Sequence, residues 1–170
     1  LCGGAPSHVV EAGAAPDHSR AYRLDPARTQ SLVGLDIPAA EQRATLERLG
    51  ATWAASPTAL AAQVDAVITC LPNPAASEAV LDTLLPALKP GATWIEMSTL
   101  GRDDILRLGS KAEAAGLNVL EAPVTGGVHL AAQGRITVLA GGAQDVFARH
   151  RPALQAMGDR IFHMGPLGSA

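Results

Sequence analysis

The sequence predicts a doubly wound α/β fold with a mostly parallel sheet. From about residue 30 onward, short β-branched or apolar runs alternate with amphipathic helical patterns. This alternation is typical of parallel strands joined by right-handed helical crossovers. The chain has 170 residues, of which 48% are hydrophobic and only 3% aromatic. That length fits a single domain, and the scarcity of large rings suits helices packed closely on a sheet.

The first elements follow from strand and cap signals. We expect a strand over Ser31–Ile37, then a helix that Pro38 opens and Gly50 closes. The run Val64–Leu71 is apolar on both faces, which predicts a strand covered by helices on each side. Asn73 precedes a proline and then a periodic apolar pattern, so it is the expected N-cap of the next helix.

The rest of the chain repeats the same pattern to its end. Cys70 and Trp94 fall in predicted strands and Trp53 in a strand-like region, so all three are expected in the core. The remaining predicted strands are Ala92–Met97, Leu117–Glu121, Ile136–Ala140 and Arg160–His163. Two further helices are predicted: one that includes Ile105 and ends at Gly116, and one over Val146–Met157.

Composition and motifs exclude several classes of function. The formal charge is −3 and no Lys/Arg cluster occurs, so neither nucleic acid nor a membrane is an expected partner. Two cysteines, Cys2 and Cys70, are too few for a disulfide framework, which favours a cytoplasmic location. No histidines lie at metal-ligand spacing, so no metal site is expected. Neither a G-x-S-x-G elbow nor a P-loop is present.

Ligands of such folds bind beyond the carboxyl ends of the strands, where a glycine turn and a later acid hold a dinucleotide. Gly13 follows a plausible first strand over His8–Ala12, and Asp36 lies 23 residues later, close to the spacing that a ribose-binding acid requires. Only the first glycine of G-x-G-x-x-G is present, because Ala15 and His18 stand at the other two positions. Three explanations stay open: a weak or inactive site, an N-terminal segment that departs from a working relative, or a fold that binds no nucleotide. Asp36 is also a suitable acid for a helix N-terminus.

Ordered motifs cover roughly residues 30–170 and point to a family. They resemble the β-hydroxyacid dehydrogenases, which include 3-hydroxyisobutyrate dehydrogenase, tartronate semialdehyde reductase and relatives of 6-phosphogluconate dehydrogenase. The motifs are GLDIP at 34–38, LGA at 49–51, DAVITCLPN at 65–73, EMST at 96–99, EAPVTGG at 121–127, ITVLAGG at 136–142 and ALQAMGDRIFHMGPLGS at 153–169.

The resemblance implies a Rossmann-type domain that binds NAD, with NADP as the alternative. It assigns Leu71, Pro72 and Thr99 to the cofactor, for which the spacing already suggests Gly13 and Asp36. It also assigns Thr125, Gly126 and Gly127 to a substrate loop, where backbone N–H groups and one hydroxyl grip a carboxylate. The alternative interpretation of the two glycines is a turn that needs positive φ. His129 lies two residues beyond Gly127 and within reach of that loop.

The family's catalytic lysine lies in a helix just beyond the position of Ala170, so the sequence offers no catalytic residue of that type. Lys89 and Lys111 are expected on the solvated surface instead. The predicted organisation is an atypical first strand and helix over 1–30, the Rossmann domain over 31–165, and the start of an interdomain connection over 166–170. The chain is thus expected to stop before the family's C-terminal helical domain.

Two hypotheses follow. The first is the cofactor-binding domain of an NAD(P)-dependent oxidoreductase that converts a small 3-hydroxy acid to its semialdehyde or the reverse. That enzyme would form a homo-oligomer at full length and would be inactive as this isolated chain. The second is a catalytically silent Rossmann module that serves as a binding or interaction domain.

Overall fold

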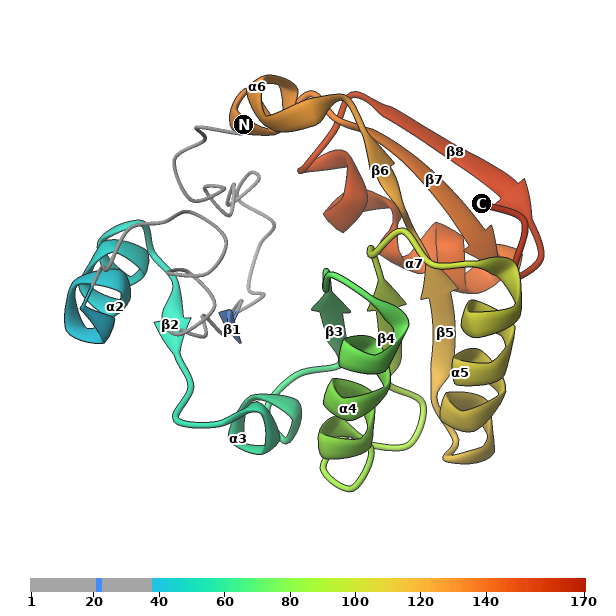
Figure 1. Cartoon of the computed structure of the whole chain (residues 1–170), viewed down its shortest axis with the longest axis horizontal. Coiled ribbons are helices and arrows are strands. Elements are labelled where there is room, and N and C mark those ends of the chain that lie inside the picture. The colour runs from blue at the N-terminus through green and yellow to red at the C-terminus, as the bar shows by residue number, and fades with distance from the viewer. Residues whose placement is uncertain (1–20, 23–37) are drawn as a thin grey trace.

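The computed structural model describes residues 21–22 and 38–170, and the elements of this part are labelled in Figure 1. Helices and strands alternate along most of it. In chain order they are β1 Ala21–Tyr22, α2 Ala39–Arg48, β2 Thr52–Trp53, α3 Pro57–Ala61, β3 Ala66–Thr69, α4 Pro74–Leu84, β4 Thr93–Glu96, α5 Arg102–Ala114, β5 Asn118–Glu121, β6 Val124–Thr125, α6 Gly127–Ala132, β7 Thr137–Gly142, α7 Gln144–Gln155 and β8 Arg160–Gly165.

A six-stranded, mostly parallel sheet organises the second part of the chain. Strands β3, β4 and β5 are parallel neighbours, and β7 joins β5 in the antiparallel sense. Strand β8 lies parallel to β7, and the short β6 pairs antiparallel with β7. The predicted α/β class with a mostly parallel sheet is confirmed, and the antiparallel β7 is the feature that the repeating pattern did not reveal.

Helices cover both faces of this sheet (Figure 1). On one face, side chains of β3, β4 and β5 form a buried hydrophobic cluster with α4 and α5 that includes Val67, Trp94 and Val119. On the other face, Ile95 and Leu120 belong to a second cluster, to which α7 contributes buried residues such as Phe147. Successive residues of a strand point to opposite faces, so β4 and β5, whose central residues are apolar, contribute to both clusters. The expectation that helices cover both faces of the strand within Val64–Leu71 is wrong at Ile68, which is 44% exposed because β3 is the edge strand of the described sheet.

Local signals explain where the helices begin. The side chain of Asn73 accepts a hydrogen bond from Ala76 N and Pro74 is the first residue of α4, as the sequence predicts. Ser56 caps α3 in the same way, but this five-residue helix was not predicted. Strand β6 and helix α6 were missed too, because elements this short carry no measurable periodicity.

The first described strands pair with each other. Strands β1 and β2 form a two-stranded parallel sheet, and within the described residues neither of them pairs with a strand of the six-stranded sheet. Among residues 38–59 whose burial is described, none is buried. Trp53 is therefore not the core residue that was expected: it is half-buried in β2, and the guanidinium of Arg43 lies 5.8 Å from its ring centroid. The expected strand Ser31–Ile37 lies outside the described residues.

No helix in the described ranges combines the length and the apolar character that crossing a membrane would require.

Candidate functional site

The carboxyl ends of β3, β4 and β5 lie side by side at one edge of the sheet. The strands end in register, with Thr69 opposite Glu96 and Glu96 opposite Glu121. The residues that follow these strands therefore form neighbouring turns. Open α/β sheets bind ligands at this edge, because the turns there are free to vary while the strands hold them in place.

The predicted turns after β3 and β4 are brought together by a direct hydrogen bond. Leu71 N donates to Ser98 Oγ at 2.6 Å. Pro72 and Thr99, the residues that follow, are exposed, whereas Leu71 is half-buried and Ser98 is buried. The ring of Pro72 and the hydroxyl group of Thr99 are thus accessible to a ligand at this edge, and the hydrogen bond between the preceding residues, Leu71 and Ser98, holds the two turns together. An apolar surface beside one hydroxyl is suited to a flat nicotinamide ring.

Beneath these turns lies a buried polar network that the sequence analysis missed. Thr69 Oγ1 donates to Glu96 Oε2 at 2.9 Å and accepts from Trp94 Nε1 at 2.8 Å. Glu96 Oε1 accepts from Ser98 N at 2.7 Å. All four residues are buried. The one available signal was a glutamate at the end of the otherwise apolar predicted strand Ala92–Met97, since an unpaired carboxyl group is costly to bury.

The predicted substrate loop lies farther along the sheet. Strand β6 continues the register of β5 against β7, with Val124 opposite Val138 and Thr125 opposite Thr137. Thr125 therefore sits roughly 13 Å beyond the end of β5, at about 3.3 Å per residue. Gly126 and Gly127 have φ angles of +126° and +71°, so the interpretation as a turn with positive φ is confirmed.

No described hydrogen bond ties this loop to the turns after β3 and β4. His129 lies beside it, since a Cβ added at Gly127 would come within 3.6 Å of the imidazole Cε1. His129, Thr125 and Gly127 are all exposed. The loop is thus open to a ligand, and its contact with substrate stays a prediction.

Cys70 corrects an expectation. It is exposed at the end of β3, not buried in the core, because it lies one residue beyond the strand on the open edge of the sheet. Its Sγ donates to Met97 O at 3.8 Å. Although the residue as a whole is exposed, its thiol lies against Met97 O and is partly shielded from water; this desolvation raises the pKa of the thiol, and the charge of nearby Glu96 raises it further. The thiol is therefore a poor nucleophile at neutral pH.

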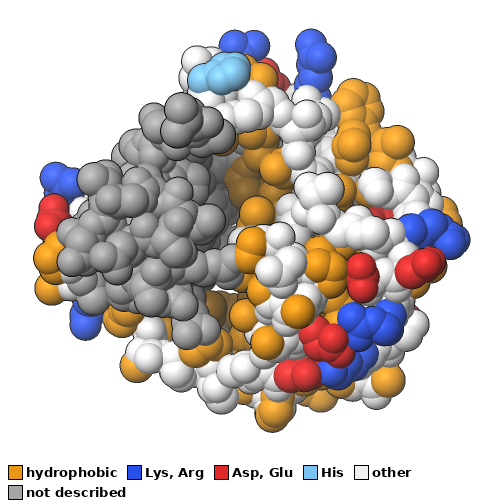
Figure 2. Space-filling model, viewed as in Figure 1, with side chains coloured by type: hydrophobic (Ala, Val, Ile, Leu, Met, Phe, Trp, Pro, Cys, Tyr) orange, Lys and Arg blue, Asp and Glu red, His pale blue; other side chains and the backbone are white. Residues whose placement is uncertain are grey.

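The two lysines are surface residues, as predicted. Lys111 pairs with Asp82 and with Glu78 across α4 and α5. The hydrogen bond that Lys111 donates to Asp82 raises the pKa of Lys111, so the ammonium group is kept protonated. Figure 2 shows acidic and basic side chains gathered over this face. Lys89 is exposed and lies 3.7 Å from an Asp65 oxygen. Neither ammonium group is a candidate for proton transfer at the predicted site.

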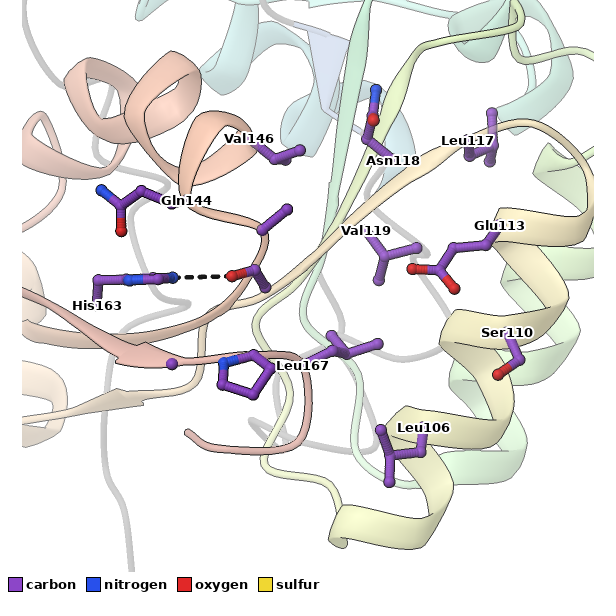
Figure 3. Close-up of a pocket in the computed structure, with 14 residues that line it drawn as sticks. Leu106, Ser110, Glu113, Leu117, Asn118, Val119, Gln144, Val146, His163 and Leu167 are labelled. Atoms are coloured by element: carbon purple, nitrogen blue, oxygen red, sulfur yellow. Dashed lines mark hydrogen bonds between the residues drawn. The ribbon is translucent and has the colours of Figure 1, made fainter.

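A cavity of about 800 Å³ lies at the other end of β5 (Figure 3). Its walls come from α5, the start of β5 and the ends of β7 and β8, and His163 Nε2 hydrogen-bonds Gly142 O at its side. The predicted cofactor turns do not line it. The cavity is therefore separate from the edge on which Leu71 and Thr99 lie.

Two predicted cofactor residues, Gly13 and Asp36, lie outside the described residues. Within the described ranges, no group of three or more His, Cys, Asp or Glu side chains could hold a metal ion.

A mostly parallel α/β sheet with helices on both faces, whose strands β3, β4 and β5 end together at one edge, is an architecture found in dinucleotide-binding domains. Residues 25–165 match the NAD binding domain of 6-phosphogluconate dehydrogenase. The chain therefore belongs to this family, the NAD-binding domains of the β-hydroxyacid dehydrogenases, and the predicted membership is confirmed.

Individual relatives agree. The NAD-dependent L-serine dehydrogenase of Pseudomonas aeruginosa is 36% identical over 123 residues, which are 71% of this chain and 41% of that protein. The solved structure of Mycobacterium tuberculosis 3-hydroxyisobutyrate dehydrogenase with L-serine superposes with a TM-score of 0.73 at 31% identity, covering 78% of this chain and 45% of that one. The chain thus spans less than half the length of these dehydrogenases.

A different relative matches a shorter stretch. The β subunit of phenylalanine–tRNA ligase from Ruegeria pomeroyi is 68% identical over 50 residues, which are 29% of this chain and 6% of that protein. The sequence analysis did not detect this similarity.

Proposed function

We propose that this chain supplies the cofactor-binding domain of an NAD(P)-dependent oxidoreductase that interconverts a small 3-hydroxy acid and its semialdehyde. The observation that carries the proposal is the hydrogen bond from Leu71 N to Ser98 Oγ, 2.6 Å long. It joins two turns that the family uses for its cofactor, at the sheet edge where such ligands bind. A bound nicotinamide nucleotide would supply the hydride chemistry, and this chain's residues would orient it.

Leu71, Pro72 and Thr99 would hold the nicotinamide end of the cofactor. The exposed Pro72 and Thr99 fit this role, since a planar ring can lie against the proline while the hydroxyl orients its amide. Gly13 and Asp36 would serve the phosphates and the ribose. A carboxylate at Asp36 repels a 2′-phosphate, so NAD is preferred over NADP.

The loop Thr125–Gly127 would bind the carboxylate of the substrate through its hydroxyl and N–H groups. We expect binding without turnover from this chain, because neither Lys89 nor Lys111 is placed for proton transfer. The longer enzyme would be a cytoplasmic homo-oligomer that acts on a small hydroxy acid or semialdehyde, with no nucleic-acid or membrane partner.

The dinucleotide-binding domain is proposed over 31–165, with residues 1–30 as its atypical first strand and helix, and the family match over residues 25–165 supports a start before α2. The six-stranded sheet and both hydrophobic clusters are built from residues after β2. The described sheet is therefore the part of this domain that carries Leu71, Pro72 and Thr99.

Titration with NADH, followed through the fluorescence of the reduced cofactor, tests the proposal. Saturable binding, weaker for NADPH and without hydroxy-acid oxidation, is the expected result. Thr99→Val should weaken NADH binding by about 5-fold or more, because it removes the hydroxyl at the edge. Thr52→Val makes the same chemical change at an exposed position of β2 and should leave the affinity unchanged. Equal affinities for both variants would count against the proposed edge.

The second candidate, a catalytically silent module, is favoured by the tRNA ligase match. The ligase match covers 50 residues, which are 29% of the chain. We infer that the ligase-like stretch is the N-terminal one, because the family match begins only at residue 25. That stretch would then include Gly13 and replace the family's phosphate-binding turn. Absence of NADH binding at millimolar concentration, by a chain that is folded by circular dichroism, would support this candidate over the first.

A further inference from the structure

Two buried carboxyl groups lie side by side under the carboxyl edge of the sheet. Glu96 ends β4 and Glu121 ends β5, and the two are register partners, so their side chains leave the same face of the sheet. Only 1% of Glu96 and 5% of Glu121 is exposed. Burying a carboxyl group is unfavourable unless hydrogen bonds compensate for the lost water, so the partners of each group show what it holds in place.

Glu96 holds residues of the two turns on its own side. Its Oε2 accepts from Thr69 Oγ1 at 2.9 Å, just before the turn after β3. Its Oε1 accepts from Ser98 N at 2.7 Å, in the turn after β4. One rigid side chain thus spans both strand ends.

Ser98 connects Glu96 to the turn after β3. With its backbone N–H fixed by Glu96, its hydroxyl is directed to the neighbouring strand end and accepts from Leu71 N at 2.6 Å. Leu71 precedes Pro72, whose ring allows few backbone conformations. The three residues therefore form a series in which Glu96 orders Ser98 and Ser98 orders the turn at Leu71.

Glu121 has different partners. Its Oε1 accepts from the N–H groups of Gly168, Ser169 and Ala170, which follow β8. None of its described hydrogen bonds reaches the turns after β3 or β4. It is therefore a natural control: a carboxyl group of similar burial, in the same register, that secures another part of the chain.

We propose that Glu96 is a positioning residue of the cofactor site: through Ser98 it fixes the geometry of the Leu71–Pro72 turn on which the nicotinamide end of the cofactor rests. The proposal depends on the proposed function for the identity of the ligand. The ordering of the turn depends on the hydrogen bonds alone. Two experiments on the full chain test the ordering of the turn and the binding of the cofactor separately.

The first experiment needs no ligand. Amide hydrogen exchange is measured by NMR at Leu71 in the parent chain and in Glu96→Gln, Ser98→Ala and Glu121→Gln. Because the Leu71 N–H donates to Ser98 Oγ, exchange should become about 10-fold faster in Ser98→Ala and in Glu96→Gln. It should stay within about 2-fold of the parent rate in Glu121→Gln. Amides within β4 and β5 report whether each variant keeps its sheet.

The second experiment measures NADH affinity for the same variants and for the double variant. Ser98→Ala and Glu96→Gln should each weaken binding by about 10-fold. Because the two residues act in series, the double variant should lose no more than about 10-fold, whereas independent effects would multiply. Glu121→Gln should bind NADH like the parent chain.

The outcomes distinguish the two proposals. If the parent chain binds no NADH, the proposed function fails, while Leu71 exchange still decides whether Glu96 orders the turn. If the parent binds NADH and Glu96→Gln neither exposes the Leu71 amide nor weakens binding, the positioning role is refuted. Losses that multiply in the double variant would refute the series as well. Should Glu96→Gln fail to fold, Glu96→Asp, which keeps the carboxylate but shortens its reach to Ser98 N, gives the reading of exchange and affinity for this position, while Ser98→Ala tests the step from Ser98 to Leu71.

Discussion

The buried hydroxyl of Thr69 offers a direct measurement of what the polar network contributes to stability. Thr69→Val keeps the volume and shape of the side chain and removes only its hydrogen-bonding group. In the structure this hydroxyl donates to Glu96 Oε2 at 2.9 Å and accepts from Trp94 Nε1 at 2.8 Å. Both partners are closed off from water, with Trp94 0% and Glu96 1% exposed. The substitution therefore leaves one buried donor and one buried carboxyl oxygen each without a partner.

The expected loss follows from these two groups. Leaving a buried polar group unsatisfied costs about 1–3 kcal/mol, with a carboxyl oxygen at the upper end. The extra buried methyl group of valine returns less than about 1 kcal/mol. We therefore expect Thr69→Val to lower the free energy of unfolding by about 3 kcal/mol. Thr69→Ser, which keeps both hydrogen bonds and loses one methyl group, should cost about 1 kcal/mol.

Urea denaturation followed by tryptophan fluorescence measures the difference. The chain has two tryptophans, so the Trp53→Phe background leaves Trp94 as the reporter of the six-stranded sheet. Parent, valine and serine variants are compared in this background at matched m-values. A valine variant as stable as the serine variant would refute the reasoning, because it would mean that these buried groups do not need their partners.

Three further predictions concern single positions. A Cβ added at Gly158 would overlap a backbone carbonyl oxygen, whereas a Cβ at Gly116 meets nothing within 4 Å and only strains a φ of +81°. In thermal unfolding, Gly158→Ala should therefore lose much more stability than Gly116→Ala, which should lose roughly 1–2 kcal/mol. Equal losses of stability in the two variants would contradict this reasoning. Burial lowers the pKa of His150 below 6.5, so the unfolded chain binds the proton more readily, and the free energy of unfolding should fall as the pH drops from about 7.5 to 5.5. His150→Asn should flatten that slope, and an unchanged slope would exclude this histidine as its cause. Burial and the charge of Glu96 raise the pKa of Cys70 above 9.0, so iodoacetamide should alkylate this thiol more slowly than free cysteine at a pH of about 8.5, as located by mass spectrometry. Glu96→Gln should speed the reaction, and a slower reaction would contradict the stated cause.

Local features were predictable from the sequence because their causes are local. The cap at Asn73 depends on a side chain three residues from its partner, Ala76 N. The runs that became β4 and β5 are apolar on both faces because helices cover both sides of the sheet there. The EAPVTGG motif at 121–127 indicated the family, and the family match over residues 25–165 confirms it.

The sequence did not reveal how these pieces meet. The bond between Leu71 and Ser98 joins residues 27 positions apart, and it exists only because β3 and β4 pair in one register. A shift of the register by one residue would send every side chain of the strand to the other face. The same dependence explains Gly141, which lies opposite Glu121 and where any Cβ would collide with that carboxyl group.

The sequence by itself determined the class of fold and the order of its longer strands and helices along the chain, and it predicts the turns on which a ligand would rest. Periodicity, capping and motif spacing are properties of neighbours in sequence, so they can be recognised before folding. The tertiary structure alone decided that β7 runs antiparallel, that Cys70 is exposed, and that Glu96 secures the turns after β3 and β4. Those outcomes depend on strand pairing and on burial between distant segments, and no local pattern records either of them.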